Sequence, residues 1–189
     1  MTKTFFKLPL LAIVLTLLPA VAAAQRTPRT DSAAIGGEVG VFRPDADALN
    51  PSLSLDGFYE YYVSPRTSLR LGLGWTSPEY DFDPDESLRY VRFGGDMLYN
   101  WEGGAVHPFV GAGLGVYILQ RRENGDDIGD SESKLGGVLL GGVEYFTSNS
   151  VSIKGEASYH LISNADGFAG RGPRNPDGFK LTIGLKTYF

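Results

Sequence analysis

A histidine and a serine near the end of the chain have side chains that could do chemistry. They lie in the segment Tyr159-His-Leu-Ile-Ser-Asn-Ala165, where His160 could act as a base toward Ser163. Two residues separate them, so a regular strand puts the two side chains on opposite faces, and they meet only if the strand contains a bulge. The spacing therefore favours His160 as a hydrogen-bonding residue and not as a catalytic base.

An acidic run, Ser77-Pro-Glu-Tyr-Asp-Phe-Asp-Pro-Asp-Glu-Ser87, holds five carboxylates and no base. Asp81, Asp83 and Asp85 have the spacing that opens a calcium loop, but Glu86 stands where such a loop needs glycine and Arg92 where it needs a bidentate glutamate. We therefore expect a solvated surface loop over residues 77–87, with weak capture of divalent cations as the alternative. We assign no metal site, no cofactor and no catalytic residue.

A second acidic run follows a pair of adjacent arginines. Arg121 and Arg122 precede Glu123, and four further acids follow before residue 133. Carboxylates in such a run are typical of a solvated loop, whereas guanidinium groups at its base could meet anionic lipid headgroups. The sequence therefore places a possible lipid contact at Arg121 and Arg122.

The elements that position these residues are strands. Residues 33–189 alternate between apolar and small or polar side chains in eight segments of about ten residues, and Pro, Gly, Asn and Asp cluster between them. Long connections (44–52, 78–87, 120–133 and 163–177) alternate with short ones (64–67, 101–106 and 147–149), which is typical of an up-and-down barrel. The segments are residues 33–43, 53–63, 68–77, 88–100, 107–119, 134–146, 150–162 and 178–189.

The two faces of these strands differ in chemistry. One face is apolar or glycine in every strand, and it includes Leu71, Leu139 and Ile183. The other face carries six acids and five bases, together with a histidine. This charged set is Glu38, Asp56, Glu60, Arg70, Arg92, Asp96, Glu144, Lys154, Glu156, Lys180 and Lys186, and His160 lies on the same face.

The size of the barrel indicates which face points inward. An eight-stranded barrel has an interior that its own side chains fill, and eleven charged residues cannot form an apolar core. A continuous apolar outer surface would aggregate in water but suits lipid. Ten residues at roughly 3.3 Å each and a tilt near 40° span about 25 Å, the height of an outer-membrane apolar band. We therefore expect an all-β, eight-stranded antiparallel transmembrane barrel whose lumen holds a mutually paired charge network.

The ends of the chain and its composition support export. Lys3 and Lys7, the apolar stretch 8–18 and the small residues 22–24 have the pattern of a signal peptide over residues 1–24, which leaves a short leader at 25–32 and the barrel at 33–189. The chain has no cysteine, and its 22 acidic residues outnumber 17 basic ones. These counts argue against a disulfide scaffold, a cysteine nucleophile and a nucleic-acid partner.

Two strands resemble known barrels. The last strand is similar to the C-terminal signal that outer-membrane barrels present to their assembly machinery; it reads Lys180-Leu-Thr-Ile-Gly-Leu-Lys-Thr-Tyr-Phe189. A glycine-rich strand resembles one found in small barrels related to the OmpA transmembrane domain, OmpX and Ail; it reads Pro108-Phe-Val-Gly-Ala-Gly-Leu-Gly-Val-Tyr117. The likeness covers residues 33–189. It implies a location in the cell outer membrane, periplasmic termini, four outer loops and a role for Phe189 as the assembly signal.

A second resemblance raises an enzymatic alternative. The segment around His160 is similar to the His-x-Ser-Asn-Ala motif of PagL-type lipid A deacylases, which use His, Ser and Glu. Here one extra residue separates His160 from Ser163, and after Glu156 the only further acids are Asp166 and Asp177, so the family's later Glu has no counterpart.

The sequence thus favours a monomeric, non-catalytic barrel that serves envelope structure or surface interaction through its loops. The expected partners are outer-membrane lipids and lipopolysaccharide, the barrel assembly machinery and an extracellular ligand at the loops. Two alternatives remain open, namely a lipid A deacylase and a small hydrophobic-solute channel with a lateral opening.

Overall fold

The computed structural model describes residues 28–102, 104–163 and 176–189. Eight long strands make up most of this part of the chain, and two-residue strands β4 (Glu79–Tyr80) and β7 (Asp126–Asp127) extend two of the hairpins. No helix in these residues is long and apolar enough to cross a membrane. The long strands are β1 (Ala33–Pro44), β2 (Ser52–Ser64), β3 (Thr67–Thr76), β5 (Asp83–Asn100), β6 (Val106–Glu123), β8 (Glu132–Phe146), β9 (Val151–Ile162) and β10 (Gly178–Tyr188).

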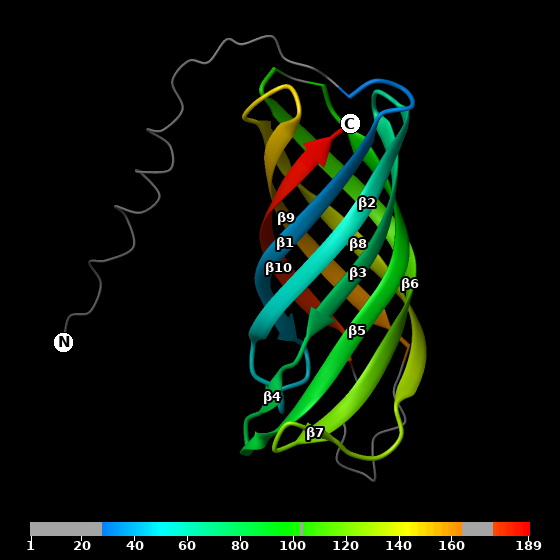
Figure 1. Ribbon diagram of the computed structural model, residues 1–189. Coiled ribbons are helices and arrows are strands. Elements are labelled where there is room, and N and C mark those ends of the chain that lie inside the picture. The colour runs from blue at the N-terminus through cyan, green and yellow to red at the C-terminus, as the bar shows by residue number, and fades with distance from the viewer. Residues whose placement is uncertain (1–27, 103, 164–175) are drawn as a thin grey trace, which may run out of the picture.

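Each long strand pairs antiparallel with its sequence neighbour among the long strands, and β1 pairs with β10 to close the sheet into a barrel (Figure 1). The closing ladder is continuous from Ala34–Tyr188 to Pro44–Gly178. Closure gives every long strand a partner on both sides over most of its length, which a lipid environment requires. The predicted eight-stranded up-and-down barrel is therefore confirmed.

The two ends of the barrel differ. The terminal end, where Ala33 and Tyr188 lie, has short connections, whereas the loop end carries β4, β7 and the longer connections (Figure 1). The predicted signal peptide and the first residues of the predicted leader lie outside the described residues. The described part of the leader packs on the terminal end, where the Asp31 amide donates to the Tyr62 carbonyl oxygen at 2.8 Å.

Most strand limits agree with the sequence pattern within two residues, but two do not. β5 starts at Asp83 and β6 ends at Glu123, so the expected loops 78–87 and 120–133 are partly strand. The ladder between β5 and β6 continues to the Glu86–Glu123 pair, and the Arg121 guanidinium forms an ion pair with Glu86 at 2.5 Å. Because this hairpin is already aligned inside the barrel, it propagates past the rim despite the Pro and Asp residues there.

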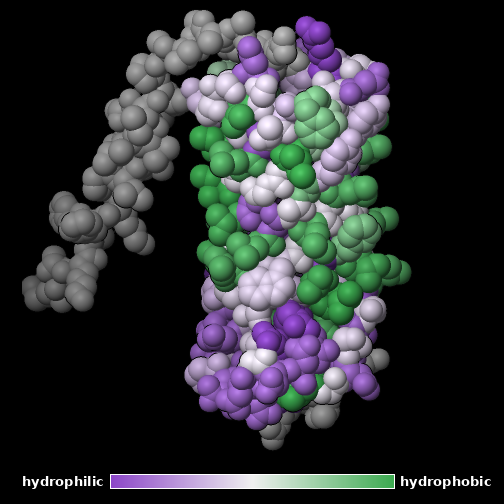
Figure 2. Space-filling model, in the orientation of Figure 1, coloured by the Kyte–Doolittle hydropathy of each residue, from purple (hydrophilic) through white to green (hydrophobic). Residues whose placement is uncertain are grey.

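The orientation of the two faces follows the prediction. Leu71, Leu139 and Ile183 point outward and are 57–59% exposed, whereas Lys154 and Lys186 are 1% exposed. Figure 2 shows the resulting hydrophobic belt around the middle of the barrel, with a strongly hydrophilic loop end. The apolar side chains thus cover the outside of the cylinder, and the charges fill its lumen.

Candidate functional site

Glycine makes room for the long charged side chains in the lumen. Four glycines on the inward face, Gly72, Gly94, Gly115 and Gly136, are direct partners across β3, β5, β6 and β8. The Arg92 side chain lies along this row, because a Cβ added at Gly94 would be 2.7 Å from its Nη2 and one at Gly115 would be 3.3 Å from its Nε. Arg92 therefore packs against Gly94 and Gly115, whereas a Cβ added at Gly136 would meet the Tyr117 ring at 2.7 Å.

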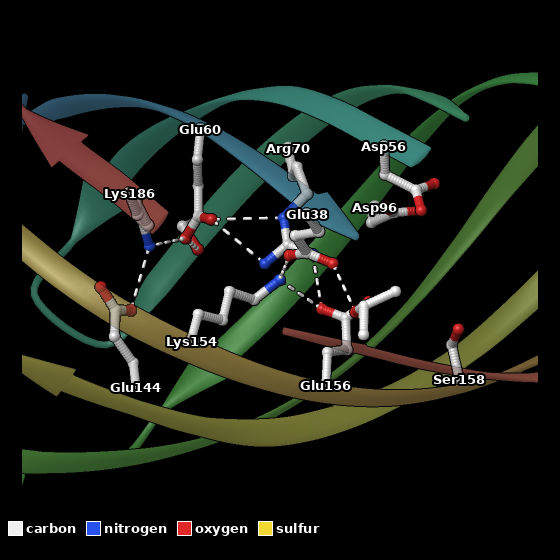
Figure 3. A network of polar contacts seen from close by, with 12 residues as sticks. Glu38, Asp56, Glu60, Arg70, Asp96, Glu144, Lys154, Glu156, Ser158 and Lys186 are labelled. Carbon is white, nitrogen blue, oxygen red and sulfur yellow. Dashed lines mark hydrogen bonds and ion pairs between the residues drawn. The ribbon is translucent and has the colours of Figure 1, made fainter. Parts of the chain in front are cut away.

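A chain of ion pairs begins near the terminal end. The Lys186 ammonium lies 3.1 Å from a carboxylate oxygen of Glu60 and 3.1 Å from one of Glu144, and it donates to the Tyr62 hydroxyl at 2.7 Å (Figure 3). Glu144 also accepts hydrogen bonds from the hydroxyls of Ser152 and Tyr188. Each carboxylate at this end thus has a cation and at least one hydroxyl.

The chain continues through Arg70. Its guanidinium donates twice to Glu60 Oε2 at 3.2 Å and once to Glu156 at 2.8 Å, and it lies 4.6 Å from the centre of the Phe58 ring. Lys154 then joins Glu156, at 2.6 Å, to Glu38. Acids and bases therefore alternate across most of the lumen (Figure 3).

Two further pairs lie toward the loop end. Lys180 binds Asp56 at 2.7 Å, and Arg92 binds Asp96 at 2.5 Å. With these pairs, all eleven charged residues that the sequence places on the inward face have an oppositely charged neighbour. Buried charges need such partners, because an unpaired charge in a low-dielectric interior is costly.

The histidine of the sequence motif also lies in the lumen. His160 is buried; its Nδ1 is 2.8 Å from the Tyr117 hydroxyl and its Nε2 is 3.1 Å from the Ser158 hydroxyl. Ser163 lies elsewhere, at the loop end, where its hydroxyl donates to the Leu135 carbonyl oxygen at 2.7 Å. The structure therefore does not bring His160 and Ser163 together, and no bulge brings their side chains to one face.

The contact between Ser158 and His160 was missed by the sequence reasoning. One residue separates them, so both side chains point inward from β9. That spacing was the signal that could have revealed the pair. Two cavities of about 30 Å³ each adjoin His160, which is room for about two water molecules apiece and not for a substrate.

An apolar plug closes the lumen at the loop end. Leu49, from the β1–β2 connection, and Tyr80 of β4 pack inside the mouth and are joined through the backbone, since Asn50 N donates to Glu79 O and Asp81 N to Ala48 O. Burial raises the pKa of Tyr80 above its ordinary value, so its phenol stays neutral. The plug consists of Phe42, Leu49, Tyr80, Leu88, Tyr90, Tyr117, Leu119 and Ile162.

A closed barrel with a charged interior and an apolar exterior is the architecture of proteins that span an outer membrane. The sequence matches the family described as the outer membrane protein beta-barrel domain over residues 10–189. The chain belongs to this family. A comparison with curated protein sequences finds no match.

Several solved structures of small outer-membrane barrels align with this chain over most of its length. Neisserial surface protein A aligns with a TM-score of 0.61 and 18% identity, over 84% of this chain and 96% of the other. Ail of Yersinia pestis aligns with a TM-score of 0.58 and 13% identity, over 85% and 99%. OprG of Pseudomonas aeruginosa aligns with a TM-score of 0.58 and 15% identity, over 86% and 97%. These identities show a shared fold, and the protein is an outer-membrane barrel.

Aromatic residues lie at both edges of the apolar belt, as expected for the interfaces of an outer-membrane barrel. Trp75, Tyr159 and Phe179 mark the loop end. A second group marks the terminal end, namely Tyr59, Tyr61, Tyr99, Trp101 and Tyr145. The C-terminal Phe189 lies in this second group, with its backbone paired to Ala33 and its ring 6.4 Å from that of Tyr59.

The acidic loops are partly neutralised by arginine. Arg121 binds Glu86, and Arg122 and Arg89 both bind Asp127, at 3.1 and 2.7 Å. Both arginines of the sequence pair are thus engaged by carboxylates of the protein, and the lipid contact expected at Arg121 and Arg122 stays a prediction. Within the described ranges, no three His, Cys, Asp or Glu residues are grouped so that they could hold a metal ion.

Proposed function

We propose that the protein is a non-catalytic outer-membrane barrel that supports envelope structure or surface interaction through its loop end. The filled lumen is the observation that carries this proposal. Its charges are mutually paired, the plug packs into one end, and the interior cavities near His160, at about 30 Å³ each, are too small for a solute path. A barrel without an aqueous path acts through its outer surface and its loops.

Conductance measurement tests the filled lumen. The purified barrel, inserted in a planar lipid bilayer, is expected to give no steady conductance steps above the bare membrane. The deletion of residues 46–49, which removes Leu49 from the plug, is a useful comparison because the ion pairs below it remain. A steady conductance through the unmodified barrel would overturn the proposal.

The geometry around His160 also argues against lipid A deacylation. The histidine is enclosed in the lumen, and Ser163 is bonded elsewhere, so a lipid in the bilayer meets no assembled pair of nucleophile and base. Mass spectrometry of lipid A from cells with and without the protein is expected to give the same acyl pattern. Loss of one acyl chain on expression would support the enzymatic alternative instead.

A lateral route for a hydrophobic solute finds no support in the wall of the barrel. The ladders on both sides of β1 run without interruption through the apolar belt. We accordingly place the interactions of the protein at its surfaces: lipid around the belt, the assembly machinery at Phe189 during insertion, and an extracellular partner at the loops. The inward charges of one barrel find their partners within that barrel and need no second copy of the chain, so we propose a monomer.

The orientation of the barrel decides whether the loops can meet such a partner. The chain lacks cysteine, so single substitutions report on one site each. Asp130→Cys lies at the loop end and Asn149→Cys at the terminal end, and both residues are exposed. A membrane-impermeant maleimide added to intact cells is expected to label only Asp130→Cys. Labelling of Asn149→Cys alone would show that the barrel has the opposite orientation in the membrane, and it would refute a surface role for the loops.

A further inference from the structure

A small cavity, which we call the seam cavity, lies between the plug and the ion pairs of the lumen. It has a volume of about 30 Å³, and four of its lining residues belong to the plug, namely Phe42, Tyr90, Tyr117 and Ile162. The rest of its lining is largely polar. This polar lining includes Ser54, Asp56, Thr76, Arg92, His160 and Lys180. The seam cavity is therefore bounded both by the apolar plug and by the charged residues of the lumen.

One hydroxyl group at the seam cavity has no partner in the protein. Tyr90 is 3% exposed, and its Oη has no hydrogen-bond partner among the described residues. The Nε of Arg92, which lines the same cavity, is also buried and lacks a partner among those residues. Native proteins pair nearly all of their buried polar groups, because an unpaired one is costly. Two such groups at one cavity therefore indicate a ligand that supplies the missing hydrogen bonds.

Neighbouring groups at the cavity have further capacity for hydrogen bonds. Lys180 donates to one Asp56 oxygen at 2.7 Å, and an ammonium group has three protons to donate. Ser54 donates to the other Asp56 oxygen at 3.0 Å, so the Ser54 hydroxyl oxygen can still accept. Donors are thus available from Tyr90, Arg92 and Lys180. Acceptors are available from Ser54 and Asp56.

The charges around the cavity indicate what the ligand is. Arg92 and Lys180 would repel a cation, and the Asp56 carboxylate would repel an anion. Each of these charges already has a partner, since Lys180 pairs with Asp56 and Arg92 pairs with Asp96. A neutral molecule that both donates and accepts hydrogen bonds suits this mixture of groups. A volume of about 30 Å³ holds about two molecules of water and excludes a larger solute.

We propose that the seam cavity binds two ordered water molecules, held by the Tyr90 hydroxyl and by polar groups of the Asp56–Lys180 and Arg92–Asp96 pairs. These waters complete hydrogen bonds that the apolar side chains of the plug cannot supply. The plug then contacts the charged residues partly through water. The inference concerns the lumen alone, so it does not depend on the orientation of the barrel or on the proposed role of the loops.

The water site belongs to the half of the lumen near the loop end. A second cavity of about 30 Å³ shares four residues with the seam cavity. These are Asp56, Arg92, His160 and Lys180. Lys186, Glu60 and Glu144 line neither cavity. Figure 3 shows Asp96 on the side of the network away from Glu144. The waters therefore serve the ion pairs next to the plug and not those of Lys186.

A crystal structure of the barrel tests the site directly. We expect two peaks of water density in the seam cavity, one of them within about 3 Å of the Tyr90 hydroxyl. The Tyr90→Phe variant is expected to lose that peak. Crystals soaked in bromide are expected to show no anomalous peak in the cavity. A bromide peak there, or a cavity without ordered density, would overturn the proposal.

Urea unfolding in lipid vesicles tests the same site in a membrane. The Tyr90→Phe substitution keeps the ring and removes only the hydroxyl. If water binds this hydroxyl, the substitution removes a hydrogen bond, and we expect the equilibrium constant for unfolding to rise about two- to tenfold. If the hydroxyl has no partner, the substitution removes a buried unsatisfied group and stabilises the barrel. An unchanged or lower constant for Tyr90→Phe would therefore count against the water site.

Tyr99→Phe is the matched control for this measurement. Tyr99 belongs to the same strand, β5, but lies on the outer surface and is 40% exposed. Its substitution is expected to change the equilibrium constant for unfolding by less than about twofold. A gel shift on boiling shows that each variant is folded before it is titrated.

Discussion

Replacing Lys186 with methionine is expected to destabilise the barrel by about 3 kcal/mol. The ammonium group is 1% exposed and serves two carboxylates, Glu60 and Glu144, each at 3.1 Å. Removing one partner of a buried ion pair costs about 3–5 kcal/mol, because a charge is left without compensation. We expect the lower end of that range, since Glu60 keeps Arg70 and Glu144 keeps the hydroxyls of Ser152 and Tyr188.

Urea unfolding of the barrel in lipid vesicles measures this change. Tryptophan fluorescence is a suitable signal, because Trp75 and Trp101 both lie on the outer surface. The surface pair Arg66–Glu102 supplies the control: its side chains are 58% and 40% exposed, and Arg66→Gln is expected to cost less than about 1 kcal/mol.

The double variant Lys186→Met/Glu144→Gln separates charge imbalance from loss of packing. Glu144 has Lys186 as its cation, so removing both leaves Glu60 with Arg70 and restores the balance. We expect the double variant to be more stable than Lys186→Met alone. A cost for Lys186→Met no larger than that for Arg66→Gln would refute the view that the paired lumen charges hold the barrel together.

Three further outcomes follow from the same geometry. Gly113→Val is expected to lower the free energy of unfolding by about 1–3 kcal/mol, because its Cβ would lie 2.0 Å from an Asp96 carboxylate oxygen. Gly57→Ala is expected to change the free energy of unfolding by less than about 0.5 kcal/mol, since its Cβ would meet only a carbonyl oxygen at 4.0 Å. Urea titration of both variants measures the difference. Leu71→Arg, in the middle of the lipid belt, is expected to cost about 2–4 kcal/mol in the same assay. Deletion of Phe189 removes its backbone hydrogen bonds with Ala33 and is expected to lower the fraction of barrel that resists detergent before boiling, and an unchanged fraction would argue against its role in assembly.

Much of the fold could be predicted because every second side chain of a strand lies on the same face, so the residue types along the strand indicate what each face contacts. Leu71, Leu139 and Ile183 share a phase with uncharged neighbours, and the charges occupy the opposite phase. The pairing within the lumen could not be predicted in the same way. Lys154 meets Glu38 across 116 residues of sequence, and such a contact depends on barrel register and diameter, which alternation does not specify.

The features that the sequence did not reveal have local causes. Leu49 and Tyr80 are single apolar residues in polar connections, and only the backbone bonds between those connections turn them into a plug. The extension of β5 to Asp83 was hidden by Pro84 and the surrounding acids, which are typical of a turn. The pairing of Ser158 with His160 was visible in principle, since alternate residues of a strand share a face.

The hairpin of β5 and β6 continues past the last pair of the β3–β5 ladder as a two-stranded extension of the barrel wall. From Tyr90 to Asp83 the strand continues for about 23 Å at roughly 3.3 Å per residue, and cross-strand pairing stiffens it along most of that length. A flexible tether would let its tip take many positions relative to the barrel. The paired strands instead hold Phe82 and its neighbouring acids at a set distance from the rim of the barrel, with the Phe82 ring 5.2 Å from that of Tyr80, so any partner at this tip would meet an aromatic ring among carboxylates in one position.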